Sequence, residues 1–219
     1  MSINIAIDGP TAAGKSSISK LLAQRLNYAH IDTGSMYRSV AYKALSKNLS
    51  LDDEEAICEM LKTTSIKITP EGFLLLDGVC LNDEIRTNEM SLAASSVSKL
   101  KKVREYLVDC QKEMAKEKGY IMDGRDIGTV VLKDAELKIF LTATAFARAN
   151  RRHQQNIEKK IPSDFEVLKK EIELRDYQDT TRNHSPLIQA EDAVLIDSSN
   201  LTIEQVVDTI FELVKQKGE

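Results

Sequence analysis

The sequence lacks long hydrophobic runs, paired cysteines and an excess of basic residues. No apolar segment approaches the ~20 residues of a membrane-spanning helix, and the N-terminus lacks the basic-then-apolar pattern of a signal peptide. Its three cysteines, Cys58, Cys80 and Cys110, are widely spaced and show no metal-type pairing, which indicates free thiols in a reducing cytoplasm. A net charge of −4 argues against a general nucleic-acid binder. We therefore expect a cytoplasmic protein with neither a membrane segment nor a nucleic-acid partner.

Two kinds of functional motif are also missing. His30, His153 and His184 stand in no pattern with cysteine or serine, so we expect structural or surface roles for them. The D-x-x-G and [NT]-K-x-D motifs of GTPase switches occur nowhere in the chain. These absences argue against a GTPase switch and leave no histidine with an evident catalytic role.

The composition and the pattern of segments indicate one α/β domain with an insertion. The chain has 219 residues, 42% hydrophobic and 29% charged, as in an ordinary soluble globule. Apolar strand segments alternate with helical ones, which predicts a parallel sheet covered by helices on both faces. We expect strands at 3–7, 28–32, 120–124, 137–141 and 193–197. We expect helices at 16–26, 33–45, 51–62, 99–114 and 202–215.

Two local patterns refine this outline. The last helix opens with a capping box between Thr202 and Gln205. Its apolar stripe, which we expect to be buried, consists of Ile203, Val206, Val207, Ile210 and Val214. Between residues 65 and 83 the pattern instead alternates and carries turn signals at Pro70–Glu71–Gly72 and Asp77–Gly78. This segment predicts a small antiparallel β unit inserted into the strand–helix chain.

A phosphate-binding loop follows the first predicted strand. Gly9, Gly14, Lys15 and Ser16 match G-x-x-x-x-G-K-[ST]. The glycines let backbone N–H groups point at phosphate oxygens, and the following helix adds its positive N-terminal end. Lys15 can reach the β- and γ-phosphates, and the Ser16 hydroxyl suits Mg²⁺. The residues predicted to hold the nucleotide phosphates are Gly9, Pro10, Thr11, Ala12, Ala13, Gly14, Lys15, Ser16 and Ser17.

Carboxylates stand where ligands of a parallel sheet gather. Asp8, Asp32 and Asp123 lie at or just after the carboxyl ends of three predicted strands. Asp123 is a candidate for orienting Mg²⁺ through a water molecule. A purely structural carboxylate is an equally good interpretation of this residue.

Three sets of basic residues suggest a second phosphate beside the first. They are Arg125 with Asp126 just past a strand, Arg148, Arg151 and Arg152 on one helical face, and Arg175, Asp179 and Arg182 on another. Each set alone has an ordinary explanation, such as pairing with carboxylates, a solvated helix face or a salt-bridge ladder. Beside a phosphate loop they favour a small-molecule kinase, because two polyphosphates in one dry site need several cations to offset their repulsion.

The combination of "IDGPTAAGKS", "DTGSMYR", "EIRTNE", "DGRDIGTVV", "KIFLTA" and "RDYQDTTR" resembles the bacterial-type cytidylate kinases, which phosphorylate CMP and dCMP with ATP. The blocks occur in order over nearly the whole chain. The resemblance implies a single P-loop kinase domain over 1–219, with a five-stranded parallel sheet. It also implies an acceptor-binding domain at 60–100 and a helical lid at 150–165. Nothing in the sequence demands a partner chain, so we expect a monomer.

The resemblance also implies site roles. The acceptor phosphate would be held by Thr33, Arg38, Arg125 and Arg182, with Tyr37 lining the same pocket. The ribose would face Arg175 and Asp179, and the cytosine Ser95, Arg104 and Asp126. The choice of Ser95 over the adjacent Ser96 remains open. The lid would contribute Arg148, Arg151 and Arg152, and the catalytic set would be Lys15, Arg125, Arg148, Arg152 and Arg182.

The predicted reaction needs no general base. A phosphate monoester has a second pKa near ~6 and is mostly dianionic at neutral pH. Positioning and charge stabilisation by Lys15, Mg²⁺ and the lid arginines would then suffice for an in-line phosphoryl transfer. Two alternatives remain: a P-loop kinase for another small acceptor such as UMP, and a nucleotide-binding regulatory module without turnover.

Overall fold

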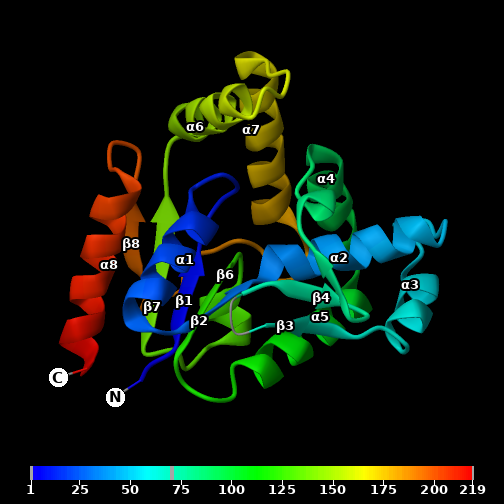
Figure 1. Cartoon of the computed structure of the whole chain (residues 1–219), viewed down its shortest axis with the longest axis horizontal. Coiled ribbons are helices and arrows are strands. Elements are labelled where there is room, and N and C mark those ends of the chain that lie inside the picture. Colours follow the sequence, from blue (N-terminus) through cyan, green and yellow to red (C-terminus); the bar gives the residue numbers. More distant parts are fainter. Residues whose placement is uncertain (1, 70–71, 219) are drawn as a thin grey trace.

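A five-stranded parallel sheet forms the centre of the protein (Figure 1). The structure is a computed structural model that describes residues 2–69 and 72–218. The strands run in the order β2–β6–β1–β7–β8, and every neighbouring pair is parallel. Their bounds are β1 (Ile5–Asp8), β2 (Ala29–Asp32), β6 (Tyr120–Gly124), β7 (Leu137–Thr142) and β8 (Val194–Asp197). The predicted sheet is therefore confirmed. Because β1 lies between β6 and β7, the loop after β1 opens into the crevice at the carboxyl ends of the strands.

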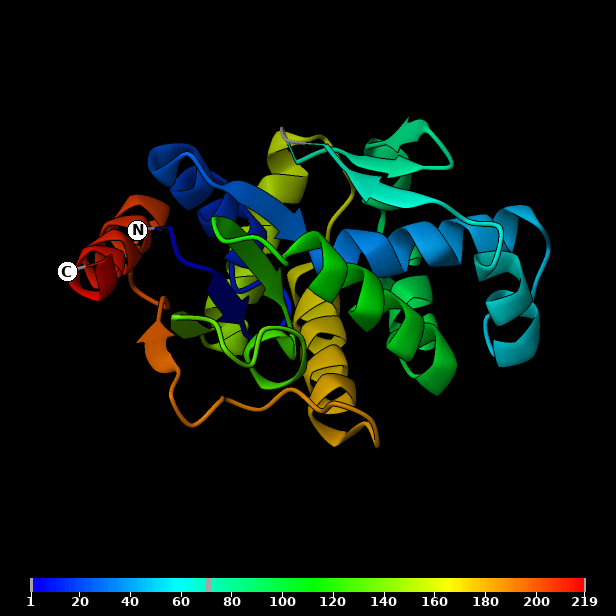
Figure 2. The ribbon, with the colours of Figure 1, turned by 90° about the horizontal axis from the view of Figure 1, so that it is seen from below.

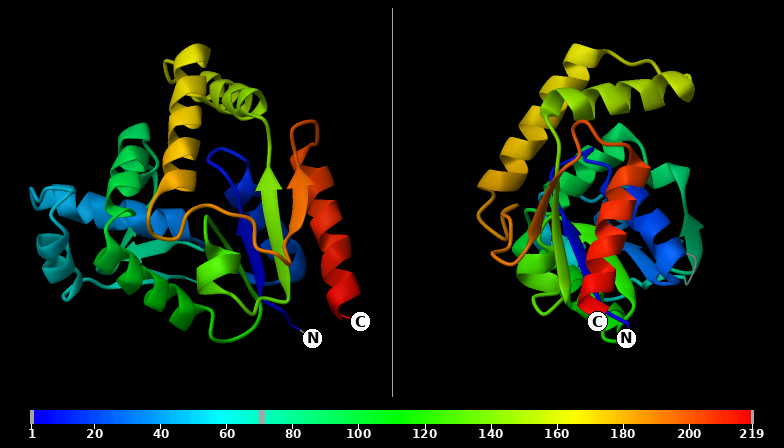
Figure 3. Two further views of the ribbon diagram at one scale, coloured as in Figure 1. Left: turned by 180° about the vertical axis from the view of Figure 1, so that it is seen from behind. Right: turned by 90° about the vertical axis from the view of Figure 1, so that its left-hand side faces the viewer.

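Helices cover both faces of this sheet (Figure 2). One face carries α1 (Lys15–Leu26) and α8 (Ile203–Gly218). The other side carries α2 (Thr33–Ser46), α3 (Glu54–Leu61), α4 (Asn88–Val97) and α5 (Lys101–Met114). Above the carboxyl ends of the strands rise α6 (Ala145–Glu158) and α7 (Phe165–Thr181) (Figure 3). None of the helices described is long and apolar enough to cross a membrane.

The alternation of side chains along β1 divides the core into two clusters. Ile5 and Ile7 pack toward α1 and α8, whereas Ala6 between them packs toward α2 and α5. All three are fully buried, as expected for a central parallel strand covered on both faces. The sheet is thereby fixed between two layers, and its carboxyl edge is left to hold ligands.

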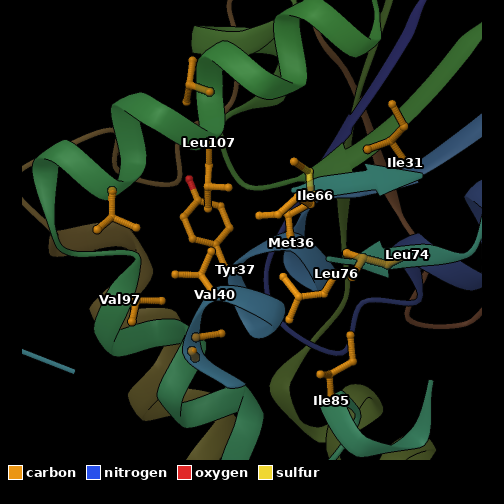
Figure 4. Packing of buried hydrophobic residues seen from close by; sticks show 14 of the residues in the cluster. Ile31, Met36, Tyr37, Val40, Ile66, Leu74, Leu76, Ile85, Val97 and Leu107 are labelled. Atoms are coloured by element: carbon orange, nitrogen blue, oxygen red, sulfur yellow. The ribbon is translucent and has the colours of Figure 1, made fainter. Parts of the chain in front are cut away.

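The predicted antiparallel unit is present and shares the second cluster. It consists of β3 (Ile66–Ile68), β4 (Leu74–Leu76) and β5 (Val79–Leu81). Leu74 and Leu76 pack near Met36 and Val40 of α2 (Figure 4). The unit is thus attached to the α/β core through continuous apolar packing rather than through a separate core of its own.

The turns of this unit agree with the sequence where the structure describes them. Asp77 and Gly78 both have positive φ, as a two-residue hairpin between β4 and β5 requires. Of the other turn signal, Pro70 and Glu71 lie outside the described residues, and Gly72 has a φ of 84°. At the C-terminal end of the chain, Thr202 and Gln205 exchange the two predicted capping hydrogen bonds at 2.9 and 3.2 Å.

Two expectations about helix faces are wrong. Ile203 is 40% exposed, although the other four members of its stripe are buried. It is the first residue of α8 and lies at the carboxyl edge of the sheet, where it borders a cleft. Arg182 does not share a helical face with Arg175 and Asp179, because α7 ends at Thr181 and Arg182 is extended (φ −64°, ψ 145°). The Thr181 hydroxyl donates to the Tyr177 carbonyl, and such a hydrogen bond between a side chain and the helix backbone weakens the last turn.

Candidate active site

A cleft of about 750 Å³ lies over the carboxyl ends of the strands. Its floor is the loop after β1, and its walls come from α2, α4, α6, α7 and the segment at 198–206. Nearly all the predicted site residues line it. The exceptions are Gly9 and Pro10, which form the start of the loop, and Arg148. The predicted site residues are thus brought to one cavity from segments spread over the whole chain.

The floor has the geometry of a phosphate-binding loop. A Cβ on Gly9 would lie 1.9 Å from the Leu141 carbonyl oxygen, so only glycine fits there. Gly14 has a φ of 92°, and Ala12 has a φ of 56°. Lys15 Nζ donates to the Gly9 and Pro10 carbonyls, each at 2.8 Å. The predicted strand–loop–helix arrangement is therefore present.

Within the described residues, the Lys15 ammonium group forms no direct ion pair with a carboxylate. The side chain is buried, and burial lowers its pKa to about 7, assisted by the positive charge of Arg125. The carboxylates of Asp123, Asp179 and Asp8 act in the opposite direction but do not prevail. A phosphate bound over the loop would reverse this shift, because a nearby negative charge favours the protonated amine.

Asp123 links the loop to β2. Ser16 Oγ donates to Asp123 Oδ2 at 2.8 Å, and His30 Nε2 lies 2.6 Å from Asp123 Oδ1. Burial alone would lower the pKa of His30, but the hydrogen bond and charge of Asp123 outweigh it and raise that pKa. The expected structural role of His30 thus includes holding a carboxylate at the cleft. No signal in the sequence indicated this contact, because it depends on β2 and β6 being neighbours in the sheet.

The residues at this point suit Mg²⁺ bound mainly through substrate phosphates. The Ser16 hydroxyl and the Asp123 carboxylate lie together at the N-terminal end of α1. In the described part of the chain, no group of three or more His, Cys, Asp or Glu side chains could hold a metal ion. A divalent cation would therefore take few protein ligands and several water or phosphate oxygens, as Mg²⁺ does in kinases.

Opposite the loop, arginines line the cleft in pairs with aspartates. Arg38 Nη2 donates to Asp32 Oδ2 at 2.8 Å, and Arg125 Nε donates to Asp179 Oδ2 at 2.7 Å. Burial raises the pKa of Asp179, but the charge and hydrogen bond of Arg125, together with the charges of Arg175 and Arg182, outweigh it and lower that pKa. Thr33, at the N-terminus of α2, donates its hydroxyl hydrogen to the Asp123 carbonyl at 2.8 Å. The positive end of α2 thus joins the arginines on this wall.

Deeper in the same wall, Asp126 is held between two arginines. Arg104 Nη2 donates to Asp126 Oδ2, and Arg182 Nη2 lies 3.9 Å from Asp126 Oδ1. Arg182 Nε donates to the Ser185 carbonyl at 2.6 Å. Below them lies Tyr37, whose ring centroid is 5.6 Å from Arg104 Cζ and whose pKa is raised to about 12 by burial. This recess offers a carboxylate and guanidinium groups side by side.

The guanidinium groups around the cleft have unused donors. Within the described residues, six buried side-chain polar atoms have no hydrogen-bond partner. Four of the six are Arg38 Nε, Arg104 Nε, Arg175 Nε and Arg182 Nη2. Burial and the neighbouring Arg125 lower the pKa of Arg175 to about 10, and burial and Arg104 lower the pKa of Arg182. Buried donors in native proteins are normally paired, so this wall is suited to an anionic ligand with several oxygens.

The three arginines of α6 occupy different environments rather than one free face. Arg148 is buried behind the loop, where Nη1 donates to the Thr11 carbonyl at 2.9 Å and Nη2 lies 2.6 Å from Asp176 Oδ2. Arg151 donates to the Ser198 carbonyl and borders the cleft. Arg152 also borders it, and its Nη2 donates to Asn88 Oδ1 at 3.0 Å.

Several contributors to the cleft escaped the sequence analysis. Asp176 accepts from the Thr11 amide at 3.3 Å as well as pairing with Arg148, so it ties α7 to the phosphate loop. The wall at 198–206 is apolar and hydroxylic and matches no motif. Ser95 borders the cleft and donates to Gln178 Oε1 at 3.3 Å, whereas Ser96 is absent from the lining. Ser95 is thus a residue that the sequence predicts; of the other two contributors, only Asp176 has a signal in the sequence, its adjacency to Arg175.

Comparison with known proteins gives a consistent family. Residues 5–216 match the family model described as cytidylate kinase. A cytidylate kinase of Caldicellulosiruptor saccharolyticus is 54% identical over 214 residues, covering 96% of this chain and 95% of the relative. Those of Geobacillus sp. (strain WCH70) and Enterococcus faecalis are 50% and 48% identical, covering 98% and 99% of this chain and 97% of each relative.

Solved structures place the fold among P-loop kinases. A shikimate kinase from Bacteroides thetaiotaomicron superposes with a TM-score of 0.52 at 13% identity, covering 98% of this chain and 99% of the other. A shikimate kinase from Acinetobacter baumannii, in complex with shikimate, gives 0.50 at 12% identity, covering 99% and 94%. At such identity the likeness concerns the fold alone.

Proposed function

The chain belongs to the cytidylate kinase family and is a nucleoside monophosphate kinase that acts on CMP with ATP as donor, and from this premise we propose how its cleft performs the transfer. The observation that carries the proposal is a set of four arginines that line the cleft, each with one buried guanidinium nitrogen that has no hydrogen-bond partner within the described residues. We assign the phosphates of ATP to the loop and the acceptor nucleotide to the arginine-lined wall. Since one chain supplies every assigned residue, the proposal requires only a monomer.

On the acceptor side, the proposed phosphate ligands are Thr33, Arg38, Arg125 and Arg182, with Tyr37 beneath them. We assign the ribose to Arg175 and Asp179 and extend the acceptors to CMP and dCMP. The cytosine would occupy the recess at Asp126, Arg104 and Ser95. Cytosine presents an amino donor at position 4 and an acceptor at position 3, so a carboxylate beside guanidinium groups matches its hydrogen-bond polarity.

On the donor side, Lys15 would leave the Gly9 and Pro10 carbonyls and turn to the β- and γ-phosphates. Mg²⁺, when bound, would neutralise phosphate charge; Ser16 would contact it directly and Asp123 through water. The wall at 198–206 would accommodate the nucleoside of ATP. Arg151 and Arg152 would approach the phosphates from α6. Arg148, for which we expected a catalytic role, would instead shape the loop through Thr11 and Asp176.

The proposed mechanism relies on position and charge rather than on a base. The acceptor phosphate is already mostly dianionic at neutral pH. Lys15, Arg125, Arg152 and Arg182 surround the cleft from both sides, so charge that moves during an in-line transfer stays near fixed cations. Exclusion of water by the surrounding helices would prevent hydrolysis of ATP.

Base recognition can be tested with Asp126→Asn. UMP would place its O4 against the Asp126 carboxylate, two acceptors with no proton between them, at a cost of ~1–3 kcal/mol or roughly 5- to 150-fold. An asparagine amide can donate to O4. We therefore expect the variant to narrow the ratio of kcat/KM for CMP over UMP, mainly by reducing activity on CMP. ADP release measured across all ribo- and deoxynucleoside monophosphates gives this ratio.

A different outcome would identify a structural carboxylate. Asp126 pairs with Arg104 in the structure, and loss of this pair alone would reduce activity on both nucleotides equally. An unchanged CMP/UMP ratio would therefore contradict base recognition by Asp126. Asp53→Asn, at the N-cap of α3 and remote from the cleft, serves as the matched control.

We propose that residues 150–165 act as a lid over the phosphates, with residues 60–100 forming the acceptor domain. The connection between α6 and α7 is exposed, and Ile157 and Ile161 are 52% and 49% exposed. A segment with so few buried contacts should open readily without ligand. We expect amide hydrogen exchange at 150–165 to slow when a bisubstrate nucleotide binds, while exchange at residues 207–216 of α8, which do not line the cleft, stays constant. Equal exchange with and without the ligand would argue against a lid.

A further inference from the structure

Asp8 joins two segments next to the cleft, and the residues that it connects are 119 positions apart in the chain. It is the last residue of β1, directly before the phosphate loop, and only 5% of it is exposed. Its Oδ1 accepts from the Ile127 amide at 2.8 Å, and its Oδ2 accepts from the Gly128 amide at 2.7 Å. Each carboxylate oxygen is therefore committed to one backbone N–H group of the same segment.

That segment is the single π-helical turn η2 (Ile127–Val131), which follows Arg125 and Asp126 without a linker. The Asp126 carbonyl accepts from the Val130 amide at 2.9 Å, so the turn begins at the residue assigned to the base. The Asp8 carboxylate lies at the N–H end of the turn, where a negative charge is stabilising. Asp8 thus holds the start of the turn that carries Asp126.

The packing around this contact leaves little freedom. A Cβ on Gly128 would lie 3.4 Å from Asp8 Oδ2 and 3.1 Å from Lys138 Cδ. A Cβ on Gly124, on the other side of Arg125 and Asp126, would lie 2.6 Å from Thr33 Oγ1. Residues 125 and 126 are therefore held at both ends, by close packing at Gly124 and by the Asp8 carboxylate at η2.

We propose that Asp8 is a positioning residue for the acceptor nucleotide: by clamping the start of η2, it fixes Asp126 and Arg125 at the base and phosphate of CMP. This inference rests on the proposed function, which assigns those two residues to the acceptor. Asp8 does not touch the substrate. Its carboxylate connects the central strand β1 to η2 and so holds the acceptor wall at a fixed distance from that strand.

An alternative is that Asp8 positions the neighbouring phosphate loop instead of the acceptor wall. Asp8 precedes Gly9, and its charge acts on Lys15. However, its side-chain hydrogen bonds in the described structure go to η2, whereas Lys15 Nζ is bonded to the Gly9 and Pro10 carbonyls. We therefore expect loss of the Asp8 carboxylate to weaken binding of the acceptor before that of ATP.

The test uses Asp8→Asn. Asparagine keeps the shape but sets an NH₂ group against one of the two amide N–H donors, so one hydrogen bond is lost. Burial raises the pKa of Asp8 to about 6, although both amides oppose the shift, so assays at pH 8 keep the wild-type carboxylate ionised. Calorimetry should show the Kd for CMP rising roughly tenfold or more, the effect of losing a hydrogen bond to a charged group. The Kd for ATP should stay within about twofold of the wild-type value. A larger loss for ATP than for CMP would overturn the proposal.

A double-mutant cycle with Asp126→Asn tests the route of the effect. If Asp8 acts by placing Asp126, the losses of kcat/KM on CMP should fall well short of additive in the double variant. Additive losses would overturn the positioning role. If the assignment of Asp126 to the base is wrong, Asp126→Asn alone will leave the CMP/UMP ratio unchanged. The positioning role of Asp8 is then still tested by comparing the losses of CMP affinity and ATP affinity in Asp8→Asn.

A second variant covers the outcome that Asp8→Asn does not fold. Gly128→Ala crowds the same contact from the other side, against Asp8 Oδ2 and Lys138 Cδ. It should weaken CMP binding selectively, as Asp8→Asn does. Asp53→Asn is the matched control, since it also removes a carboxylate that accepts from a backbone amide, at 3.0 Å from Ala56 N, but outside the cleft. Equal effects of Gly128→Ala on CMP and ATP would contradict the proposal.

Discussion

Replacing Lys15 with alanine is expected to lower kcat by at least ~100-fold while the protein stays folded, as when a preorganised group that stabilises transition-state charge is removed. The Lys15 ammonium is held at the start of the loop by two loop carbonyls. Its charge is disfavoured by burial until an anion arrives. The Lys15 charge should therefore contribute to the rate once phosphates are bound, and little to the stability of the free protein. Initial rates and thermal unfolding measured on the same sample decide the point.

Lys20→Ala is the matched control, because Lys20 lies on the same helix, is exposed and does not line the cleft. It should keep wild-type turnover. A folded Lys15→Ala variant that retained a tenth of the wild-type rate would contradict the assigned role.

Arg125→Met and Arg182→Met are each expected to reduce kcat/KM by roughly 1,000-fold or more, in the range of other phosphoryl-transfer arginines. Arg182 has a buried Nη2 without an acceptor, and Arg125 lies close enough to Lys15 to lower its pKa. Both side chains border the space between the loop and the acceptor wall. Methionine preserves much of the apolar stem and removes the charge, so the loss should reflect electrostatics. Steady-state kinetics with each substrate varied in turn measures it.

Arg25→Met controls for the substitution itself, since Arg25 forms an exposed ion pair with Asp208 far from the cleft. It should leave kcat/KM within about twofold of the wild-type value, because exposed pairs contribute little. If either cleft variant weakened only ATP binding with the acceptor saturating, that arginine would be wrongly assigned to the acceptor phosphate.

The sheet and its loop were predictable because local rules act there without competition. Ile5 and Ile7 belong to a buried strand, and Gly9, Gly14 and Lys15 follow at spacings that phosphate binding imposes. The Thr202–Gln205 capping box is equally local. In each case one short segment contains all the groups that interact.

The errors arise where distant segments meet. Ile203 fits an apolar helical stripe, but the end of α8 lies at the rim of the cleft, so the side chain stays 40% exposed. Helical spacing placed Arg182 on α7, whereas the preceding threonine side chains bond to backbone carbonyls and the helix stops first. Residue spacing alone does not show where a helix ends.

The arginines of α6 illustrate the same limit in the site. Helical spacing suggested one shared face for all three, yet Arg148 contacts the Thr11 carbonyl, Arg151 the Ser198 carbonyl and Arg152 the Asn88 amide oxygen. Those partners lie in segments far apart in the chain, so only the fold distinguishes them. His30 and Asp8 are similar cases, because their partners come from β6 and η2.

The central claim is that the arginine-lined wall binds the phosphate of the acceptor nucleotide, and comparison of CMP with cytidine tests it most directly. Calorimetric titration of the wild-type protein with each compound isolates the phosphate, since the base and ribose are the same. Several charge-assisted hydrogen bonds to one dianion predict that cytidine binds at least ~100-fold more weakly than CMP. Arg182→Met should remove most of that difference by weakening CMP alone. A cytidine Kd within a few fold of the CMP Kd would contradict the account.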